Sequence, residues 1–247
     1  GYHALYSQDN TGTEIPANVA IGAFTGYYNV TGTFNTWLGT NAGFGASAQS
    51  NSSNVGLGYN ALNKITTGTE NVSVGKDSML DNTSGAGNTA IGTEALANNT
   101  TAGENVAVGK LALYTNATTG ANTALGYTAL RFNVAANNTA VGHSALYQNT
   151  SGIQNVAVGV SAGYRNETGN YNTYLGASAG VGASGQSHTG NTGMGYKSLF
   201  STTTGGFNTA LGYLTMDSIT TGNTNVGIGS RALGTLTTGL YNVAIGG

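Results

Sequence analysis

The chain contains no cysteine, one proline and one tryptophan, and only 6% of its 247 residues are charged. The absence of cysteine excludes a disulfide framework and a thiolate metal site. The 7 basic residues are scattered and leave no positive stripe for a nucleic-acid backbone, so we expect no nucleic-acid partner. No apolar run approaches the length of about 18 residues that a membrane-spanning helix needs, so we expect no membrane insertion.

Glycine is abundant instead, with 41 copies, and 39% of the residues are hydrophobic, most of them small. Disordered chains combine low hydrophobicity with high net charge, whereas the formal net charge of this chain is only -2. We therefore expect the chain to fold.

One five-residue phrase, NVAVG at residues 105–109, returns fourteen times with only its apolar members exchanged. The copies begin at Asn18, Asn35, Asn54, Asn71, Asn88, Asn105, Asn122, Asn138, Asn155, Asn172, Asn191, Asn208, Asn225 and Asn242. Their separations are 17 residues, apart from one of 16 and two of 19. A short period held along the whole chain predicts a solenoid in which each repeat is one coil stacked on the last. The repeat is already in register at Gly1, so we expect a segment of a longer protein.

Each unit can be numbered from its first asparagine as position 1. Positions 2 and 4, such as Val156 and Val158, share one face of an extended strand because side chains alternate, and we expect that face to point inward. The glycine at position 5 predicts a bend, and a small-large pair at positions 8 and 9, most often Ala-Leu, predicts a second inward anchor. A turn rich in Asn, Thr and Gly closes the coil.

This pattern leaves no room for a helix and predicts an all-β fold. We expect one parallel β-solenoid domain, or β-roll, over residues 1–247, with coils of 17 residues. Seven coils carry an asparagine in the closing turn, and these residues could bond along the stack as a ladder. They are Asn29, Asn82, Asn99, Asn116, Asn133, Asn149 and Asn166.

Residues 18–58 and 155–195 are copies of each other, which indicates a longer internal duplication. The two 19-residue units, starting at Asn35 and Asn172, belong to these segments. Position 9 of four units in the duplication is glycine instead of leucine, so these coils must be filled by another side chain. The four residues are Gly26, Gly43, Gly163 and Gly180.

A single coil supplies only about three sizeable apolar groups, which stabilise it by a few kcal/mol at about 25 cal/mol per Å2. Fixing each residue costs about 1–2 kcal/mol of conformational entropy, so burial between chains would offset the deficit. We therefore expect a homotrimer of parallel solenoids, with a monomeric solenoid as the alternative.

The repeated phrase, as at residues 88–92, 105–109 and 242–246, resembles the repeat of YadA-type trimeric autotransporter adhesin heads. The longer unit with Ala-Leu and Asn-Thr-Thr-Gly is similar to repeats of trimeric phage and bacterial tail-fibre proteins. The resemblance covers essentially the whole chain. It implies a left-handed coil and a trimer on a virion tail fibre or a bacterial cell surface, hence an extracellular location.

The titratable residues form no catalytic pattern, so we expect no enzyme, no cofactor and no bound metal. Asp77 and Asp81 come closest to a carboxylate pair, but a glycosidase needs an acid and a base that converge on one bond. The three histidines, His3, His143 and His188, stand alone in the sequence, and we expect them to face solvent.

Aromatic residues recur directly after the glycine corner and after the anchor pair, where they would make lengthwise stripes. Such stripes are explained by stacking between coils or by sugar recognition, in which a ring packs on a pyranose face. The candidate glycan-binding residues lie in the two irregular units and beside them. They are Trp37, Tyr174, Phe34, Tyr171, Gln49 and Gln186.

These features favour a structural or adhesive fibre segment for host recognition, which spaces or presents a receptor-binding surface. Its partners would be its own copies and a cell-surface glycan or envelope protein of a target cell, bound multivalently. Two alternatives stay open. One is an ice-binding β-solenoid, which needs a Thr-x-Thr rank on one face, and the other is a polysaccharide-degrading tailspike.

Overall fold

Parallel strands of three residues recur once in every coil of the chain. The structure is a computed structural model that describes residues 1–9, 17–46, 50–185 and 187–247. Within these ranges it contains fourteen strands, which fall into two compact units, Gly1–Asn122 and Thr123–Gly247. No helix occurs in these ranges, and hence none that is long and apolar enough to cross a membrane.

Every strand covers positions 2 to 4 of its coil. The first unit contains β1 (Val19–Ile21), β2 (Thr36–Leu38), β3 (Val55–Leu57), β4 (Val72–Val74), β5 (Thr89–Ile91) and β6 (Val106–Val108). The second unit contains β7 (Thr123–Leu125), β8 (Thr139–Val141), β9 (Val156–Val158), β10 (Thr173–Leu175), β11 (Thr192–Met194), β12 (Thr209–Leu211), β13 (Val226–Ile228) and β14 (Val243–Ile245).

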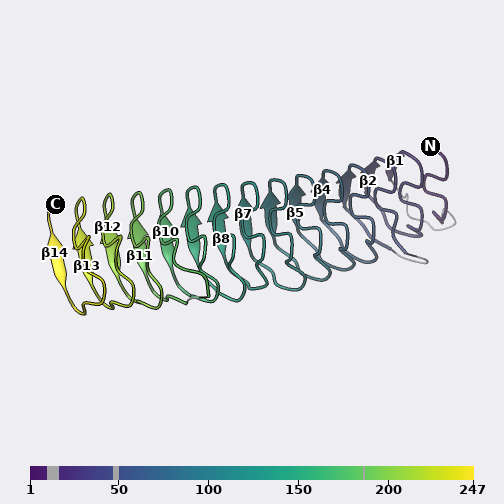
Figure 1. Cartoon of the computed structure of the whole chain (residues 1–247). Coiled ribbons are helices and arrows are strands. Elements are labelled where there is room, and N and C mark those ends of the chain that lie inside the picture. The colour runs from purple at the N-terminus through teal and green to yellow at the C-terminus, as the bar shows by residue number, and fades with distance from the viewer. Residues whose placement is uncertain (10–16, 47–49, 186) are drawn as a thin grey trace. The chain divides into compact units, whose positions relative to one another are not determined.

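Within each unit, each strand pairs in parallel with the strand of the next coil (Figure 1). The register joins residues at the same coil position, as in the pairing of Ala90 with Ala107. The prediction of an all-β parallel β-solenoid is therefore confirmed for each unit. A single domain over residues 1–247, a left-handed coil and a homotrimer stay predictions.

The strand face that points into the coil is the opposite of the one that we expected. In β9 the side chain of Ala157, at position 3, is fully buried, whereas Val156 is 37% exposed and Val158 is half-buried. The expectation that Val156 and Val158 point into the coil was wrong. The interior is narrow and already holds the leucine of position 9, so the strand can add only a small side chain to it.

The predicted bend at the position-5 glycine and the predicted inward anchor pair are both confirmed. Gly92, at position 5, has a φ of +137°, and a Cβ there would lie 2.7 Å from the carbonyl of Gly109 in the next coil, so only glycine fits. Four residues later in each coil the anchor also has a left-handed φ, which is +51° at Leu113. This conformation is unfavourable for leucine, but it directs the side chain into the core, where Leu113 is fully buried.

The asparagines at position 1 form a hydrogen-bonded row in each unit, which the sequence pattern did not lead us to expect. The backbone N–H and the Nδ2 of Asn88 both donate to Oδ1 of Asn71, at 3.0 Å each. Nδ2 of Asn88 also donates to the carbonyl of Ala102 in the closing turn, at 2.9 Å. The row thus joins each strand to the previous coil and to the turn of its own coil.

The ladder predicted for the closing turns is also present. Nδ2 of Asn99 donates to Oδ1 of Asn82 at 2.7 Å, and Nδ2 of Asn149 donates to Oδ1 of Asn133 at 2.7 Å. All four residues are fully buried. Because buried amides need partners, these two rows fix the register of successive coils.

Candidate functional site

Trp37 and Tyr174, which we expected to stack on a sugar, are core residues. Both side chains are fully buried, in β2 and β10. A ring without an exposed face cannot contact a glycan, so these two residues are removed from the candidate set. Each occupies position 3 of its coil, where most coils have alanine.

These rings fill the space left by the missing leucines. A Cβ built on Gly43 would lie 2.5 Å from the ring of Trp37, and one built on Gly26 would lie 3.0 Å from it. In the second unit, a Cβ on Gly180 would lie 2.2 Å from the ring of Tyr174. In the two irregular coils, the large inward side chain therefore lies at position 3 and glycine lies at position 9, whereas most coils have alanine at position 3 and leucine at position 9.

Of the other candidates, the structure describes only Phe34 and Tyr171. Phe34 and Tyr171 are 64% and 57% exposed, both at the last position of a coil, and they belong to different units. Gln49 and Gln186 lie outside the described residues. Isolated exposed aromatic residues are common on protein surfaces, so Phe34 and Tyr171 alone do not define a binding site.

His188 is buried, contrary to our expectation that it faces solvent. Its Nδ1 lies 2.8 Å from the hydroxyl oxygen of Tyr174, and its Nε2 has no hydrogen-bond partner among the described residues. Burial lowers the pKa of His188 to about 4 and raises the pKa of Tyr174. At neutral pH, both groups are therefore uncharged inside the coil. In the sequence, nothing marks His188 except its place in a duplicated unit, where Asn51 is the equivalent residue.

Acidification is expected to destabilise the chain through His188. The ordinary pKa of 6.5 applies to the unfolded chain, and the pKa of about 4 applies to the folded one, so the unfolded chain takes up a proton first as the pH falls. Stability should decrease from about pH 6.5 to pH 4, by on the order of 3 kcal/mol. Urea midpoints measured at fixed chain concentration across this range would show the decrease.

Two variants isolate the contribution of His188. His188→Asn, which introduces the residue found at Asn51 in the first unit, should remove most of the pH dependence, whereas His143→Asn on the exposed surface should not. An unchanged pH dependence in His188→Asn would show that other groups cause it.

The aromatic stripes stack between successive coils, as one of the two explanations predicted. The rings of Tyr147 and Tyr164 are parallel within 7° at 5.0 Å, and those of Tyr196 and Tyr213 are parallel within 17° at 5.5 Å. Because such stacking stabilises neighbouring coils by itself, a stripe indicates a binding site only where additional groups surround it.

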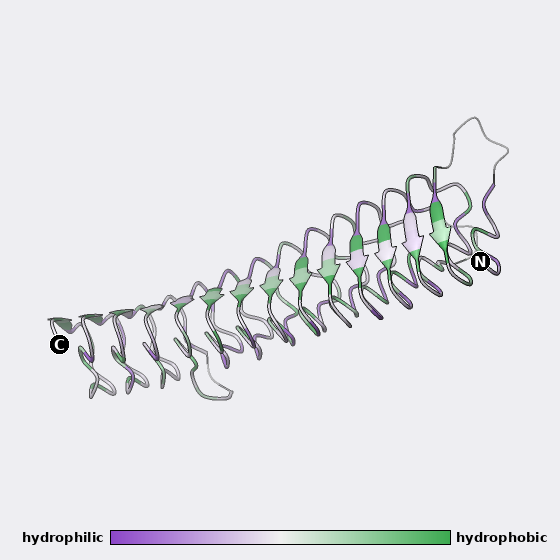
Figure 2. Cartoon of the chain, turned by 90° about the horizontal axis from the view of Figure 1, so that it is seen from above, coloured by the Kyte–Doolittle hydropathy of each residue, from purple (hydrophilic) through white to green (hydrophobic). Residues whose placement is uncertain are grey.

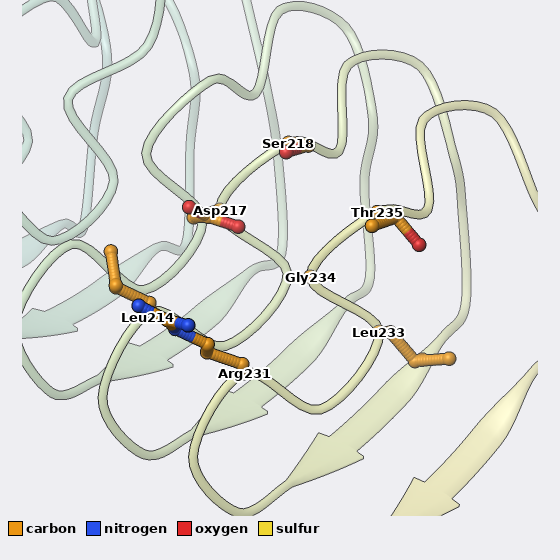
Figure 3. A pocket seen from close by; sticks show the side chains of 7 residues that line it. All are labelled: Leu214, Asp217, Ser218, Arg231, Leu233, Gly234 and Thr235. Atoms are coloured by element: carbon orange, nitrogen blue, oxygen red, sulfur yellow. The ribbon is translucent and has the colours of Figure 1, made fainter. Parts of the chain in front are cut away.

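A hollow of about 420 Å3 lies over two successive coils of the second unit (Figure 3). It exists because Gly234 has no side chain at position 10, where the preceding coil has Asp217. A Cβ on Gly234 would lie 3.5 Å from Oδ1 of Asp217. Arg231 adds one cation to the rim, but the lining supplies neither a second carboxylate nor a histidine, so it does not resemble a hydrolytic site.

The carboxylates of Asp77 and Asp81 contact different partners. Oδ1 of Asp81 lies 2.7 Å from the ammonium group of Lys64, whereas Asp77 accepts a hydrogen bond from Nδ2 of Asn60 at 2.9 Å. No cluster of three or more His, Asp or Glu residues suitable for a metal ion occurs in the described part of the chain.

The outward face of the strands carries exposed apolar residues in both units. It consists of positions 2 and 4, which are Thr or Val and Val, Ile, Leu or Met, and no strand carries a charged residue (Figure 2). Large hydrophobic residues exposed on this face are Val19, Ile21, Leu38, Ile91, Val106, Leu125, Val156, Met194, Leu211, Val243 and Ile245. Extended exposed apolar surface is typical of interaction sites, so this face is a candidate functional surface.

Comparison with protein-family models, with curated proteins and with solved structures finds no match. The resemblance of the repeated phrase to adhesin heads and tail fibres therefore stays a prediction from short motifs. The surfaces of the chain itself must support any functional assignment.

Proposed function

We propose that the chain is a segment of a homotrimeric fibre that presents or spaces a glycan-binding surface on the exterior of a virion or a bacterium. The observation that carries the proposal is the uncharged outward strand face, which is apolar in coil after coil. Within the strands, the large aliphatic residues lie on this outward face, and the inward position 3 is most often alanine. That distribution favours a protein that completes its core by association.

A second copy of the same chain is the occupant that suits this face best. Neighbouring strands of a sheet are about 4.8 Å apart, so two copies have the same repeat along the stack and can match coil by coil. The face also lacks charges that would select a different partner. The number of three copies follows from the resemblance to trimeric fibre and adhesin repeats, and three copies would add multivalency to weak contacts with a receptor.

Neither alternative function has comparable support. An ice-binding face needs a Thr-x-Thr rank, but position 4 is Val, Ile, Leu or Met in all fourteen strands. A polysaccharide-degrading tailspike needs converging carboxylates, whereas Asp77 and Asp81 are held by different partners.

A pair of variants in one coil tests the association. Val156→Lys places a charge on the outward strand face, where Val156 is 37% exposed, and should convert the trimer to single chains. The matched control is Val160→Lys, because Val160 is 55% exposed in the same coil but lies after the glycine corner. Light scattering coupled to gel filtration measures the mass. A wild-type mass equal to one chain, or equal dissociation in both variants, would contradict the proposal.

A further inference from the structure

The first unit carries a surface of aromatic and amide side chains on the segment that follows the glycine corner. It surrounds two adjoining hollows of about 330 and 340 Å3 that share Asn41 and Phe44. The remaining lining residues are Phe24, Tyr27 and Tyr28 in one hollow and Tyr59, Asn60 and Asn63 in the other. We call this set of eight residues the aromatic-amide surface. None of the predicted glycan-binding residues belongs to it.

Three aromatic rings of this surface pack against one another, two of them parallel and the third nearly perpendicular to both. The rings of Tyr27 and Phe44 are parallel within 16°, with centroids 5.4 Å apart, and come from successive coils. The ring of Tyr28 stands across both, at 80° to Tyr27 and 85° to Phe44. Backbone hydrogen bonds hold the arrangement, including one of 3.0 Å from the N–H of Tyr28 to the carbonyl of Phe44. The surface is therefore preorganised.

The amides beside the rings form an oriented row. Nδ2 of Asn41 donates to Oδ1 of Asn60 at 3.1 Å, and Nδ2 of Asn60 donates to Oδ1 of Asp77 at 2.9 Å. Because the carboxylate at the end can only accept, it fixes which way each amide points. An amide offers two N–H donors and an acceptor, so the row can exchange hydrogen bonds with hydroxyl groups in both directions.

The internal duplication shows that the coil does not require these residues. The second unit has Ser161, Arg165, Ser178, Val181 and Lys197 where the first has Phe24, Tyr28, Asn41, Phe44 and Asn60. The two copies nevertheless share the coil lengths and the exchanged core, with Trp37 replaced by Tyr174.

The corresponding surface in the second copy is also chemically different. The ammonium group of Lys197 lies 5.5 Å from the centre of the Tyr196 ring and 5.0 Å from that of Phe200, so a cation sits over both rings. Ring stacking between coils is thus common to both units, whereas the two hollows described above lie in the first unit, and in the second a cation covers the equivalent rings.

We propose that the aromatic-amide surface binds a neutral oligosaccharide. A pyranose has apolar C–H faces that pack on rings and hydroxyl groups that exchange hydrogen bonds with planar amides. No charged side chain lines either hollow, which favours an uncharged sugar over an acidic one. Two adjoining hollows on successive coils suit a chain of sugars better than a single one. This inference rests on the proposed glycan-presenting function and names its binding surface and ligand class.

Isothermal titration calorimetry of the full chain tests the site with four probes: maltohexaose, cellohexaose, mannohexaose and xylohexaose. A hyaluronan hexasaccharide serves as the acidic comparison. At least one neutral probe should bind, and the hyaluronan fragment should bind more weakly. Absence of heat with all four neutral probes, or tighter binding of hyaluronan, would overturn the proposal.

Variants taken from the second copy locate the site. The double variant Asn41→Ser with Phe44→Val should weaken binding by about tenfold or more, because it removes a ring face and an amide. Tyr28→Arg introduces the residue that the second copy has at this position, should weaken binding as well, and guards against loss of folding in the double variant. Tyr164→Val removes an equivalent stacked ring from the second unit and should leave binding unchanged. Equal losses in the first-unit variants and in Tyr164→Val would contradict the location.

The same samples separate this inference from the proposed fibre. A trimeric mass without neutral sugar binding would refute the site and leave the assembly. Binding by a single chain would refute the trimer and leave the site.

Discussion

Trp37→Ala should lower the free energy of unfolding by about 3–5 kcal/mol, the range for removing a large buried aromatic side chain. The ring is fully buried and packs against three glycines, since a Cβ on Gly26, Gly43 or Gly56 would lie 2.5–3.0 Å from it. Glycines have no side chains that could move into the cavity. Urea unfolding at fixed chain concentration measures the loss.

Because the side chains at positions 3 and 9 fill the same space, substitutions at both positions can be combined in a sharper test. Gly43→Leu in the wild type should be destabilising by about 1–3 kcal/mol or more, because its Cβ would lie 2.5 Å from the Trp37 ring. In the Trp37→Ala background the same change should be stabilising, because it restores the Ala-and-Leu combination of coils such as that of Ala90 and Leu96. The backbone accepts leucine there, since φ is +59° at Gly43 and +52° at Leu96.

This double-mutant cycle has a clear contrary outcome. If Gly43→Leu has the same sign and a similar size in both backgrounds, the two positions do not share one space. The filling of the irregular coils by Trp37 would then need another explanation.

Asn88→Ala should cost about 3 kcal/mol or more, the second large effect that we expect. Asn88 is fully buried, and its Oδ1 accepts a hydrogen bond from the backbone N–H of Asn105 at 3.0 Å. Its Nδ2 donates to Oδ1 of Asn71 and to the carbonyl of Ala102. Alanine would leave the buried N–H of Asn105 without its acceptor, at about 1–3 kcal/mol, and would remove one of the two hydrogen bonds to Oδ1 of Asn71 and to the carbonyl of Ala102, at about 1 kcal/mol each. Water cannot replace the amide easily in a row that is closed by the next coil.

The control for this prediction is in the same coil. Asn98→Ala alters a half-buried asparagine outside the row and should change stability by about 0.5 kcal/mol at most. Thermal unfolding followed by circular dichroism compares the two. Similar melting temperatures for Asn88→Ala and Asn98→Ala would show that the row contributes little.

The sequence period was sufficient to predict the architecture, because each coil must bring position 1 back to the same place. The asparagine, the glycine corner and the buried Ala-Leu pair recur at fixed spacing, and the structure places them as a strand start, a bend with φ near +130° and an anchor. The Asn rows were only partly predicted. Repetition indicates that asparagines stack, but not which of them reach a neighbouring carbonyl.

The candidate binding residues were predicted poorly for a physical reason. Trp37 and Tyr174 stand out in the sequence as large aromatic residues in irregular units, and this suggested exposure. Their burial depends on the glycines of the preceding and following coils, which lie 11 and 19 residues away in the sequence and become neighbours only when the coils stack. The aromatic-amide surface was missed in the same way, because it gathers residues from three coils.

The sequence alone determined that the chain is a stack of short β coils, since period, glycine placement and alternation are local properties. Only the tertiary structure decided which strand face is inside. Alternation separates Val156 and Val158 from Ala157 but does not say which set is buried, and hydropathy favours the valines. The width of the closed coil decides instead: once leucine occupies the interior, alanine fits beside it and the valines must lie outside.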